Sequence, residues 1–494
     1  MKTRGWEKLH IRPVEKNAIS KYNGNMPSTF LFYDLETFGL DTKADRIAQA
    51  ACIRTDMNLK VIKDPLVMLC RIAPDYLPSP SSCLVTGITP QQTLKEGIGE
   101  YDFITKLNRE FSVPGTIVTG FNNIAFDDEF IRNTLYRNLM DPYEREWQNG
   151  CSRWDILDLV RAVHDFRPDG MKFLHKNEKG RTSFKLVHLT EDNNIPQEGA
   201  HDALVDVFAT INVAKLIKTV QPQLFSFYFS NRTKSRVNAL LDTMHSTPVM
   251  YTCQAFSSER GFSRPVCPLT FEARRSNTVI CFDLTENAEA LLEEEDILRT
   301  KGLVYISTNR CPYIAPIGIL TGVKEVQERL LIDLELMHRN VKFIRQNKAE
   351  ILRRFVSAPQ RSESDNSSLD PDLRIYSDSF YSENDRINMK MVNAYPPEKK
   401  LKTVWHFDSD KISKLLFRQV ARNWPEVLSE NEKILWKNYC ATRLLQPFNR
   451  NPDYNSYMNE ITEKLNSIGT SAKDKLTLVA LREYGQNLYS SLMG

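Results

Sequence analysis

An apolar segment near the N-terminus, FLFYDLETFGL at 30–40, most constrains what this chain can fold into. Residues 29–33 are apolar and aromatic, which predicts a buried strand, and the strand then presents two carboxylates, Asp34 and Glu36. Side chains two apart on a strand point to the same face. Two like charges buried together are costly unless a cation neutralises them, and hard divalent cations prefer oxygen ligands. Either Mg²⁺ or Mn²⁺ binds here, or the strand ends with both acids in water.

The order of further elements predicts an α/β fold for the first part of the chain. Strands are expected at 47–53, 66–72 and 116–121, where Val, Ile and Leu are frequent. Helices are expected at 128–139, 154–166 and 203–217. This order predicts a mixed sheet covered by helices.

Length and local composition indicate several domains. A chain of 494 residues corresponds to about three domains. Short β-prone runs at 279–284 and 303–306 predict a smaller β domain, followed by one long helix over 324–355. A polar Ser/Asp-rich stretch predicts a linker, and the residues after it have helical periodicity. The expected parts are an extension at 1–27, domains at 28–220 and 221–356, a linker at 357–372 and a helical domain at 373–494.

Composition narrows the class of protein and its partners. The formal net charge is +3, so any phosphate-binding surface must be local. The 9 cysteines form no CxxC pair, which disfavours a cysteine zinc site and fits a reducing cytosol. No apolar stretch reaches the ~20 residues of a membrane span, and residues 1–20 contain no secretory apolar core. We therefore expect a cytoplasmic protein without a membrane partner.

Two further acidic motifs accompany the first. Asp127 and Asp128 follow the expected strand at 116–121, where either could simply cap the next helix. Later, His201 precedes a helix in which Asp206 lies among apolar residues, and Asp202 is the plausible N-cap. A loop histidine has a suitable pKa to activate water near neutral pH, although an exposed histidine without a role fits equally well.

Together these motifs resemble the DnaQ-like 3′→5′ exonuclease superfamily in its histidine-containing DEDDh branch. Residues 34–40 match its first motif, Asp-x-Glu-Thr-x-Gly-Leu, and position 202 is Asp rather than the Tyr of the other branch. The segments 84–90, 120–129, 152–158 and 414–425 are also similar to the bacterial exonuclease I family. That resemblance implies an α/β ribonuclease H-like (DnaQ-like) domain, an SH3-like β-barrel domain and a C-terminal α-helical domain.

The resemblance implies a function: 3′→5′ degradation of single-stranded DNA to 5′-mononucleotides by two-metal hydrolysis, processively and in DNA repair and recombination. Two Mg²⁺ ions, with Mn²⁺ as a substitute, would be held by Asp34, Glu36, Asp127 and Asp206. Asp34 would bridge the ions, Glu36 would position the metal that carries the attacking water, and His201 would be the general base. The family pattern favours Asp127 over Asp128 as the ligand.

Substrate and partner residues are expected on the same basis. Thr37 and Leu40 match positions that contact the terminal nucleotide, with turn capping and core packing as the alternatives. Three arginines are expected to contact single-stranded DNA: Arg232, which follows an aromatic run, and Arg418 and Arg422, which are spaced four apart on a helix. A solvated basic face is the usual alternative. Arg167 is the candidate for the acidic C-terminal tail of single-stranded-DNA-binding protein. A monomer is expected.

Three alternative functions remain open from the sequence. An RNA-directed exonuclease of the same superfamily would have the same acidic residues, because the choice of sugar depends on contacts to the 2′-hydroxyl. A proofreading subunit would need no extended DNA-holding domains of its own. A non-catalytic scaffold for single strands is disfavoured by the complete set of four acids and one histidine.

Overall fold

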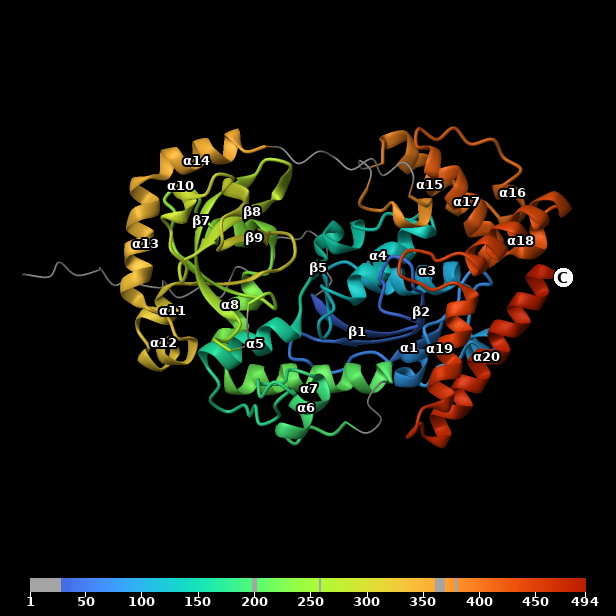
Figure 1. Cartoon of the computed structure of the whole chain (residues 1–494), viewed down its shortest axis with the longest axis horizontal. Coiled ribbons are helices and arrows are strands. Elements are labelled where there is room, and N and C mark those ends of the chain that lie inside the picture. Colours follow the sequence, from blue (N-terminus) through green and yellow to red (C-terminus); the bar gives the residue numbers. More distant parts are fainter. Residues whose placement is uncertain (1–27, 198–201, 257–258, 360–368, 378–380) are drawn as a thin grey trace, which may run out of the picture.

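The computed structural model describes residues 28–197, 202–256, 259–359, 369–377 and 381–494. Three parts follow one another along the chain, and the first lies between the other two (Figure 1). Within the described ranges, no helix is long and apolar enough to cross a membrane.

The first part is built on a five-stranded mixed sheet. Its strands are β1 (Thr29–Thr37), β2 (Ile47–Thr55), β3 (Leu66–Leu69), β4 (Thr116–Thr119) and β5 (Ser152–Arg153), arranged in the order β3-β2-β1-β4-β5. β1 pairs antiparallel with β2 and parallel with β4. The central strand β1 therefore has neighbours on both sides, as its apolar sequence requires.

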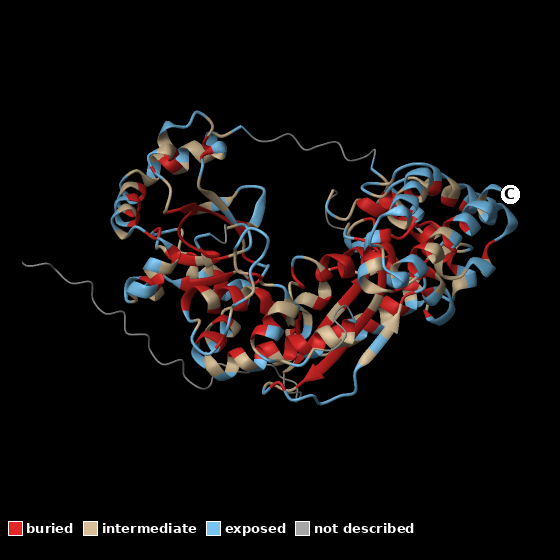
Figure 2. Cartoon of the chain, turned by 60° about the horizontal axis from the view of Figure 1, so that its bottom comes forward, coloured by how far each residue is buried: buried red, intermediate tan, exposed pale blue. Residues whose placement is uncertain are grey.

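Helices cover both faces of this sheet. They are α1 (Pro80–Thr86), α2 (Pro90–Glu96), α3 (Glu100–Phe111), α4 (Asp127–Arg137), α5 (Ile156–Phe166), α6 (Leu186–Asp192) and α7 (Ala203–Val220), with the 3₁₀ turns η1 (Glu144–Glu146) and η2 (Gln148–Gly150). Phe30 and Phe32 of β1 pack in one cluster with residues of α5 and α7. Leu31 and Tyr33 face the other way, toward α3 and α4. Figure 2 shows the sheet as buried and the outer helices as partly exposed.

The second part contains an antiparallel sheet of five strands in the order β10-β6-β7-β8-β9. Its elements are α8 (Pro222–Ser230), α9 (Lys234–Leu240), β6 (Val249–Thr252), β7 (Ser263–Glu272), β8 (Arg275–Asp283), α10 (Ala290–Glu293), η3 (Ile297–Arg299), β9 (Leu303–Ser307), β10 (Tyr313–Pro316), α11 (Gly318–Thr321), α12 (Lys324–Leu330), α13 (Leu334–Gln346) and α14 (Lys348–Ser357). Met250 and Cys267 join the same apolar cluster as α5 and α7 of the first part. The two parts therefore share a core.

The third part is helical. It contains η4 (Pro371–Leu373), α15 (Glu383–Ala394), α16 (Pro397–Lys400), α17 (Asp410–Asn423), η5 (Pro425–Val427), α18 (Glu430–Leu445), α19 (Tyr454–Asn466) and α20 (Ala472–Met493). Ser429 and Glu432 form a capping box that starts α18. Leu478 and Leu481 of α20 pack against Phe38 and Tyr76 of the first part. The helical part is thus docked onto the side of the mixed sheet opposite the second part (Figure 1).

Two sequence predictions differ from the structure. The expected helix over 324–355 is divided into α12, α13 and α14. The first break occurs because Leu331 adopts a left-handed conformation with φ of 52° and Asp333 caps a new helix, and the second lies at Asn347. The polar linker expected at 357–372 ends in the buried turn η4, where Asp372 is 0% exposed. Arginines of α17 compensate the charge of Asp372. The polar composition of the segment therefore did not mean that all of it is exposed to solvent.

Candidate active site

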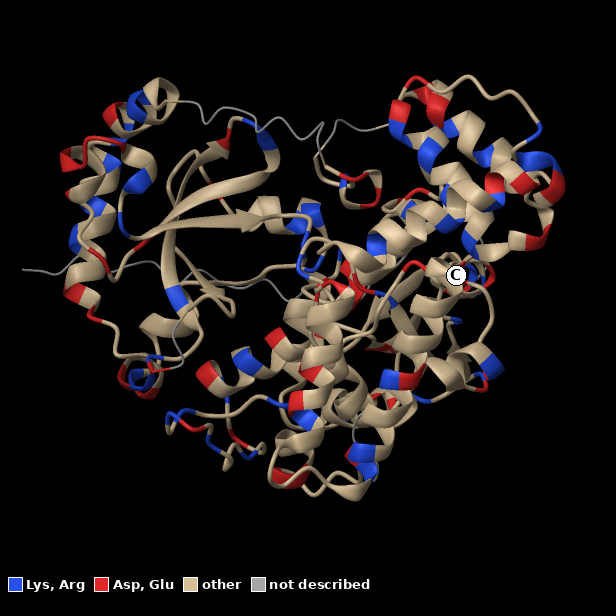
Figure 3. Cartoon of the chain, turned by 45° about the vertical axis from the view of Figure 1, so that its right-hand side comes forward, with Lys and Arg blue, Asp and Glu red and all other residues tan. Residues whose placement is uncertain are grey.

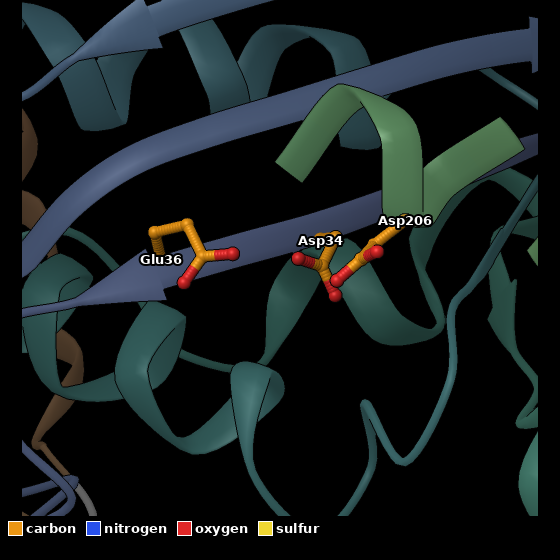
Figure 4. Close-up of side chains that lie close together, drawn as sticks. All are labelled: Asp34, Glu36 and Asp206. Atoms are coloured by element: carbon orange, nitrogen blue, oxygen red, sulfur yellow. The ribbon is translucent and has the colours of Figure 1, made fainter. Parts of the chain in front are cut away.

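Three carboxylates meet where β1 passes beneath the start of α7. Asp34 and Glu36 point to the face of β1 that packs against α7, as the two-residue spacing predicts, and Asp206 comes from α7. One possible ligand atom from each of the three lies within 4.8 Å of the others. Figure 4 shows Asp34 and Asp206 turned toward one another, with Glu36 farther along the same strand. An all-oxygen donor set of this kind fits a hard divalent cation.

The start of α7 is held by polar contacts. Asp202 is its N-cap, as predicted, and accepts hydrogen bonds from the backbone N–H groups of Leu204 and Val205. Gln197 Nε2 donates to Asp206 Oδ1 over 2.6 Å, and the Gln197 amide oxygen accepts a bond from Thr190. Gln197 was not predicted, because no motif precedes His201 at that spacing. His201 itself lies outside the described residues.

Asp127 and Asp128, at the start of α4, have different surroundings. Asp127 is buried near Asp34, and its Oδ1 accepts a hydrogen bond of 3.1 Å from the Leu35 backbone N–H. Asp128 is fully buried on the other side of the helix start, 2.7 Å from Arg145 and 2.8 Å from Arg153, and Tyr33 donates to it. Two arginines already neutralise Asp128, which leaves Asp127 as the better candidate for a metal ligand.

Burial and mutual repulsion dominate the electrostatics of the cluster. Burial, together with the charges of Asp127 and Asp206, raises the pKa of Asp34 well above its ordinary value. Burial and then the charge of Asp34 raise the pKa of Glu36 to about 9. For Asp128, burial would raise the pKa, but the charges of Arg145 and Arg153 outweigh it and lower the pKa. A cation between Asp34, Glu36 and Asp206 would relieve their repulsion.

The turn after β1 explains the rest of the first motif. Thr37 is buried and its hydroxyl donates to the Gly39 carbonyl over 2.7 Å, so it caps the turn. A Cβ at Gly39 would lie 1.9 Å from the Asp45 carboxylate, which leaves no room for a side chain there. Leu40 is 76% exposed, so it is not a core residue and its side chain is accessible to a substrate.

The arginines of α17 are not placed as predicted. Arg418 forms ion pairs with Asp370 and Asp372, and Arg422 pairs with Asp75 and Asp372. The side chains of Arg418 and Arg422 are 10% and 2% exposed. Both guanidinium groups lie inside the junction between the helical part and the mixed sheet, so the structure does not support the predicted DNA contact. Lys414 of the same helix is exposed.

Arg232 is also engaged within the protein. Its Nε donates to Ser152 over 3.1 Å, its Nη1 donates to the Phe229 carbonyl, and its guanidinium lies 3.9 Å from the centroid of the Phe229 ring. Burial lowers its pKa to about 10. These contacts brace α8 against β5, so the structure does not support the predicted DNA contact. The neighbouring Lys234 and Arg236 are exposed, as is Arg167 at the end of α5.

Known protein families match most of the chain. Residues 31–214 match the exonuclease family model, 232–358 the exonuclease I SH3-like domain and 369–488 the exonuclease I C-terminal domain. The exodeoxyribonuclease I of Buchnera aphidicola (from Schizaphis graminum) is 38% identical over 440 residues, covering 87% of this chain and 89% of that protein. The chain belongs to the exodeoxyribonuclease I family. This confirms the predicted family, the three-part fold class and an exodeoxyribonuclease activity.

Two solved structures of the exodeoxyribonuclease I family bear on ligands. The zinc-bound Escherichia coli exonuclease I–single-stranded DNA complex has a TM-score of 0.85 at 35% identity and covers 94% of this chain and 100% of that one. A structure of SSB/exonuclease I in complex with the inhibitor CFAM gives the same values. Charged residues of the present chain are spread over all three parts (Figure 3), in agreement with the small net charge.

Proposed function

We propose that this exodeoxyribonuclease removes 5′-mononucleotides stepwise from the 3′ end of single-stranded DNA, in DNA repair and recombination. The observation that carries the proposal is the convergence of Asp34, Glu36 and Asp206 within 4.8 Å at the end of a central strand. The DNA bound by the Escherichia coli relative supports the substrate class. The flanking SH3-like and helical parts would provide surfaces for a strand and so favour processive digestion.

Asp34, Glu36, Asp206 and the adjacent Asp127 are the residues that would hold two Mg²⁺ ions, or Mn²⁺ in their place. Bound there, divalent ions supply an activated water and stabilise the leaving 3′ oxygen. Glu36 would orient the attacking water, and His201 would take its proton as general base. Leu40 would pack against the terminal nucleotide, and Thr37 would hold the turn that presents Leu40.

The other candidate functions are less well supported. An RNA-directed exonuclease would have the same acidic cluster, but the relatives matched over most of this chain are exodeoxyribonucleases. A non-catalytic scaffold would not require three carboxylates within 4.8 Å of one another, since like charges brought together on burial cost free energy.

A partner and a cellular location follow from the same reasoning. The exposed Arg167 is a suitable contact for the acidic tail of single-stranded-DNA-binding protein, and a relative has been solved with SSB. Weaker binding of a tail peptide to Arg167→Ala, measured by fluorescence anisotropy, is expected, and unchanged binding would remove this assignment. We place the enzyme in the cytoplasm as a monomer; its 9 unpaired cysteines support a reducing compartment.

A digestion experiment tests the proposed activity. The protein is incubated with Mg²⁺ and 5′-labelled single-stranded DNA, duplex DNA or single-stranded RNA, and the products are separated by length. We expect a ladder of shortened single-stranded DNA, absent with chelator and absent for Asp206→Asn.

Two outcomes would contradict the proposal. Preferential shortening of RNA would move the enzyme to a ribonuclease role. No shortening of any strand, with strand binding retained in chelator, would favour the scaffold. The variant Arg353→Ala serves as a control, because it removes only an exposed ion pair with Glu350 on α14.

A further inference from the structure

The turn between β9 and β10 of the SH3-like part contacts β5 of the exonuclease domain, whose Arg153 pairs with Asp128, the neighbour of Asp127. Arg153 of β5 donates from Nη2 to the Asn309 carbonyl over 2.9 Å, and the Cys311 thiol lies 3.1 Å from the Arg153 carbonyl. Tyr313 donates its hydroxyl to the Asp155 carbonyl. These contacts bring the turn and the start of β10 against Arg153 and Asp155 of the exonuclease domain.

The conformation of this turn directs Arg310 toward α4. The Arg310 N–H donates to the Ser307 carbonyl over 3.1 Å, and Cys311 has a φ of 48°, unusual for a residue with a side chain. The Arg310 guanidinium forms an ion pair with Glu129 while its side chain stays 46% exposed. A strained residue next to a charged contact is consistent with a selected geometry rather than an incidental one.

Glu129 also receives a contact from the helical part. The Tyr376 hydroxyl donates to Glu129 Oε2, and Arg132, one helical turn away, is 2.8 Å from Glu129 Oε1. One carboxylate of the exonuclease domain thus joins the SH3-like and helical parts. In Figure 1, α4 lies between these two parts.

Further contacts hold the chain on both sides of Asp127. Asp128, the next residue, is paired with Arg153, which itself donates to the β9–β10 turn. The loop before Asp127 is held by Asp155, which accepts the backbone N–H groups of Asn122 and Ile124.

We propose that Arg310 and Tyr376 are positioning residues for the metal site: by sharing Glu129, they couple the placement of the two flanking domains to Asp127. Neither side chain is assigned a contact with the substrate or the ions. The proposal rests on the assignment of Asp127 as a metal ligand. It makes the SH3-like and helical parts contributors to the chemistry as well as holders of the strand.

The test separates positioning from strand holding. Arg310→Ala and Tyr376→Phe are titrated with Mn²⁺ without DNA by calorimetry, and kcat and KM are measured on a trinucleotide, so that contacts along a long strand do not contribute. Residues that orient ligands change metal affinity by about 10-fold or more when removed, so we expect Mn²⁺ binding by Arg310→Ala to weaken about 10-fold. The trinucleotide kcat should fall while KM changes little, and Arg310→Lys should restore most of both.

Matched variants keep the outcome decisive. Arg353→Ala removes an exposed ion pair with Glu350 in the same part of the chain and should leave both readouts unchanged. Unaltered Mn²⁺ binding and trinucleotide kcat in Arg310→Ala, with shorter runs on long strands, would overturn the proposal and make Arg310 a strand contact. Asp127→Asn is measured in parallel: if it binds Mn²⁺ like the unaltered protein, the assignment of Asp127 fails instead.

Discussion

At the residue scale, two adjacent aspartates have different surroundings. Asp127 is buried beside Asp34 and has no arginine partner among the described residues, whereas Asp128 neutralises Arg145 and Arg153. Asp127→Asn should abolish most nuclease activity and leave the free energy of unfolding nearly unchanged. Asp128→Asn should lower that free energy by about 3–5 kcal/mol, because it leaves two buried arginines without their carboxylate. Urea denaturation and digestion of the same preparations measure both; equal effects of the two variants would contradict this division.

Glu36 predicts a pH dependence at the same scale. Its pKa is raised by burial, and then by Asp34, to about 9, whereas an unfolded chain has a glutamate pKa of about 4.3. The metal-free folded state therefore holds this proton more tightly, and its contribution to stability is lost as pH rises from about 4.3 through 9.

In chelator, the melting temperature should fall less steeply with pH for Glu36→Gln than for the unaltered protein, because glutamine has no proton to lose. Adding Mg²⁺ should reduce the difference in slope, since the cation favours the ionised carboxylate. Differential scanning fluorimetry from pH 5 to 9 measures the slopes. Parallel curves for the two proteins in chelator would show that Glu36 is ionised in the folded state.

At the element scale, α17 is a docking helix. Asp75 and Asp372 face Arg422 inside the junction; burial would raise the pKa of Asp75, but the charges of Arg422 and Arg46 outweigh it and lower the pKa. Arg422→Ala should lower the free energy of unfolding by about 3–5 kcal/mol, since two buried carboxylates lose their partner. Lys414→Ala, on the exposed side of the same helix, should change it by less than about 0.5 kcal/mol. Chemical denaturation measures both, and a stable Arg422→Ala with weakened DNA binding would restore the original prediction.

The contrast between α17 and β1 shows what a sequence pattern can predict. Spacing of two in β1 and of four in α17 correctly indicates which residues share a face. For β1, the two carboxylates in an apolar strand also indicate that the face is buried. For Arg418 and Arg422, the pattern does not indicate that another domain covers the face, because the covering acids Asp75 and Asp372 are distant in sequence.

At the scale of the whole molecule, the sequence predicts the three parts but not the contacts between them. The resemblance to exonuclease I indicated the domain types, which the family models confirm. The contact of Arg310 with Glu129 joins residues 181 positions apart, and no local pattern predicts such a pair. The helices α1 and α2 were missed for a different reason: each has only 7 residues, and its proline at the first turn looks like a loop signal.

The most direct test of the central claim is an anomalous diffraction experiment on crystals grown with Mn²⁺ and a 5′-mononucleotide. The account predicts two separate peaks among the carboxylates of Asp34, Glu36, Asp127 and Asp206, with the Asp128 carboxylate still bound to Arg145 and Arg153. Peaks that avoid Asp34 and Asp206, or a metal ion on Asp128, would contradict it.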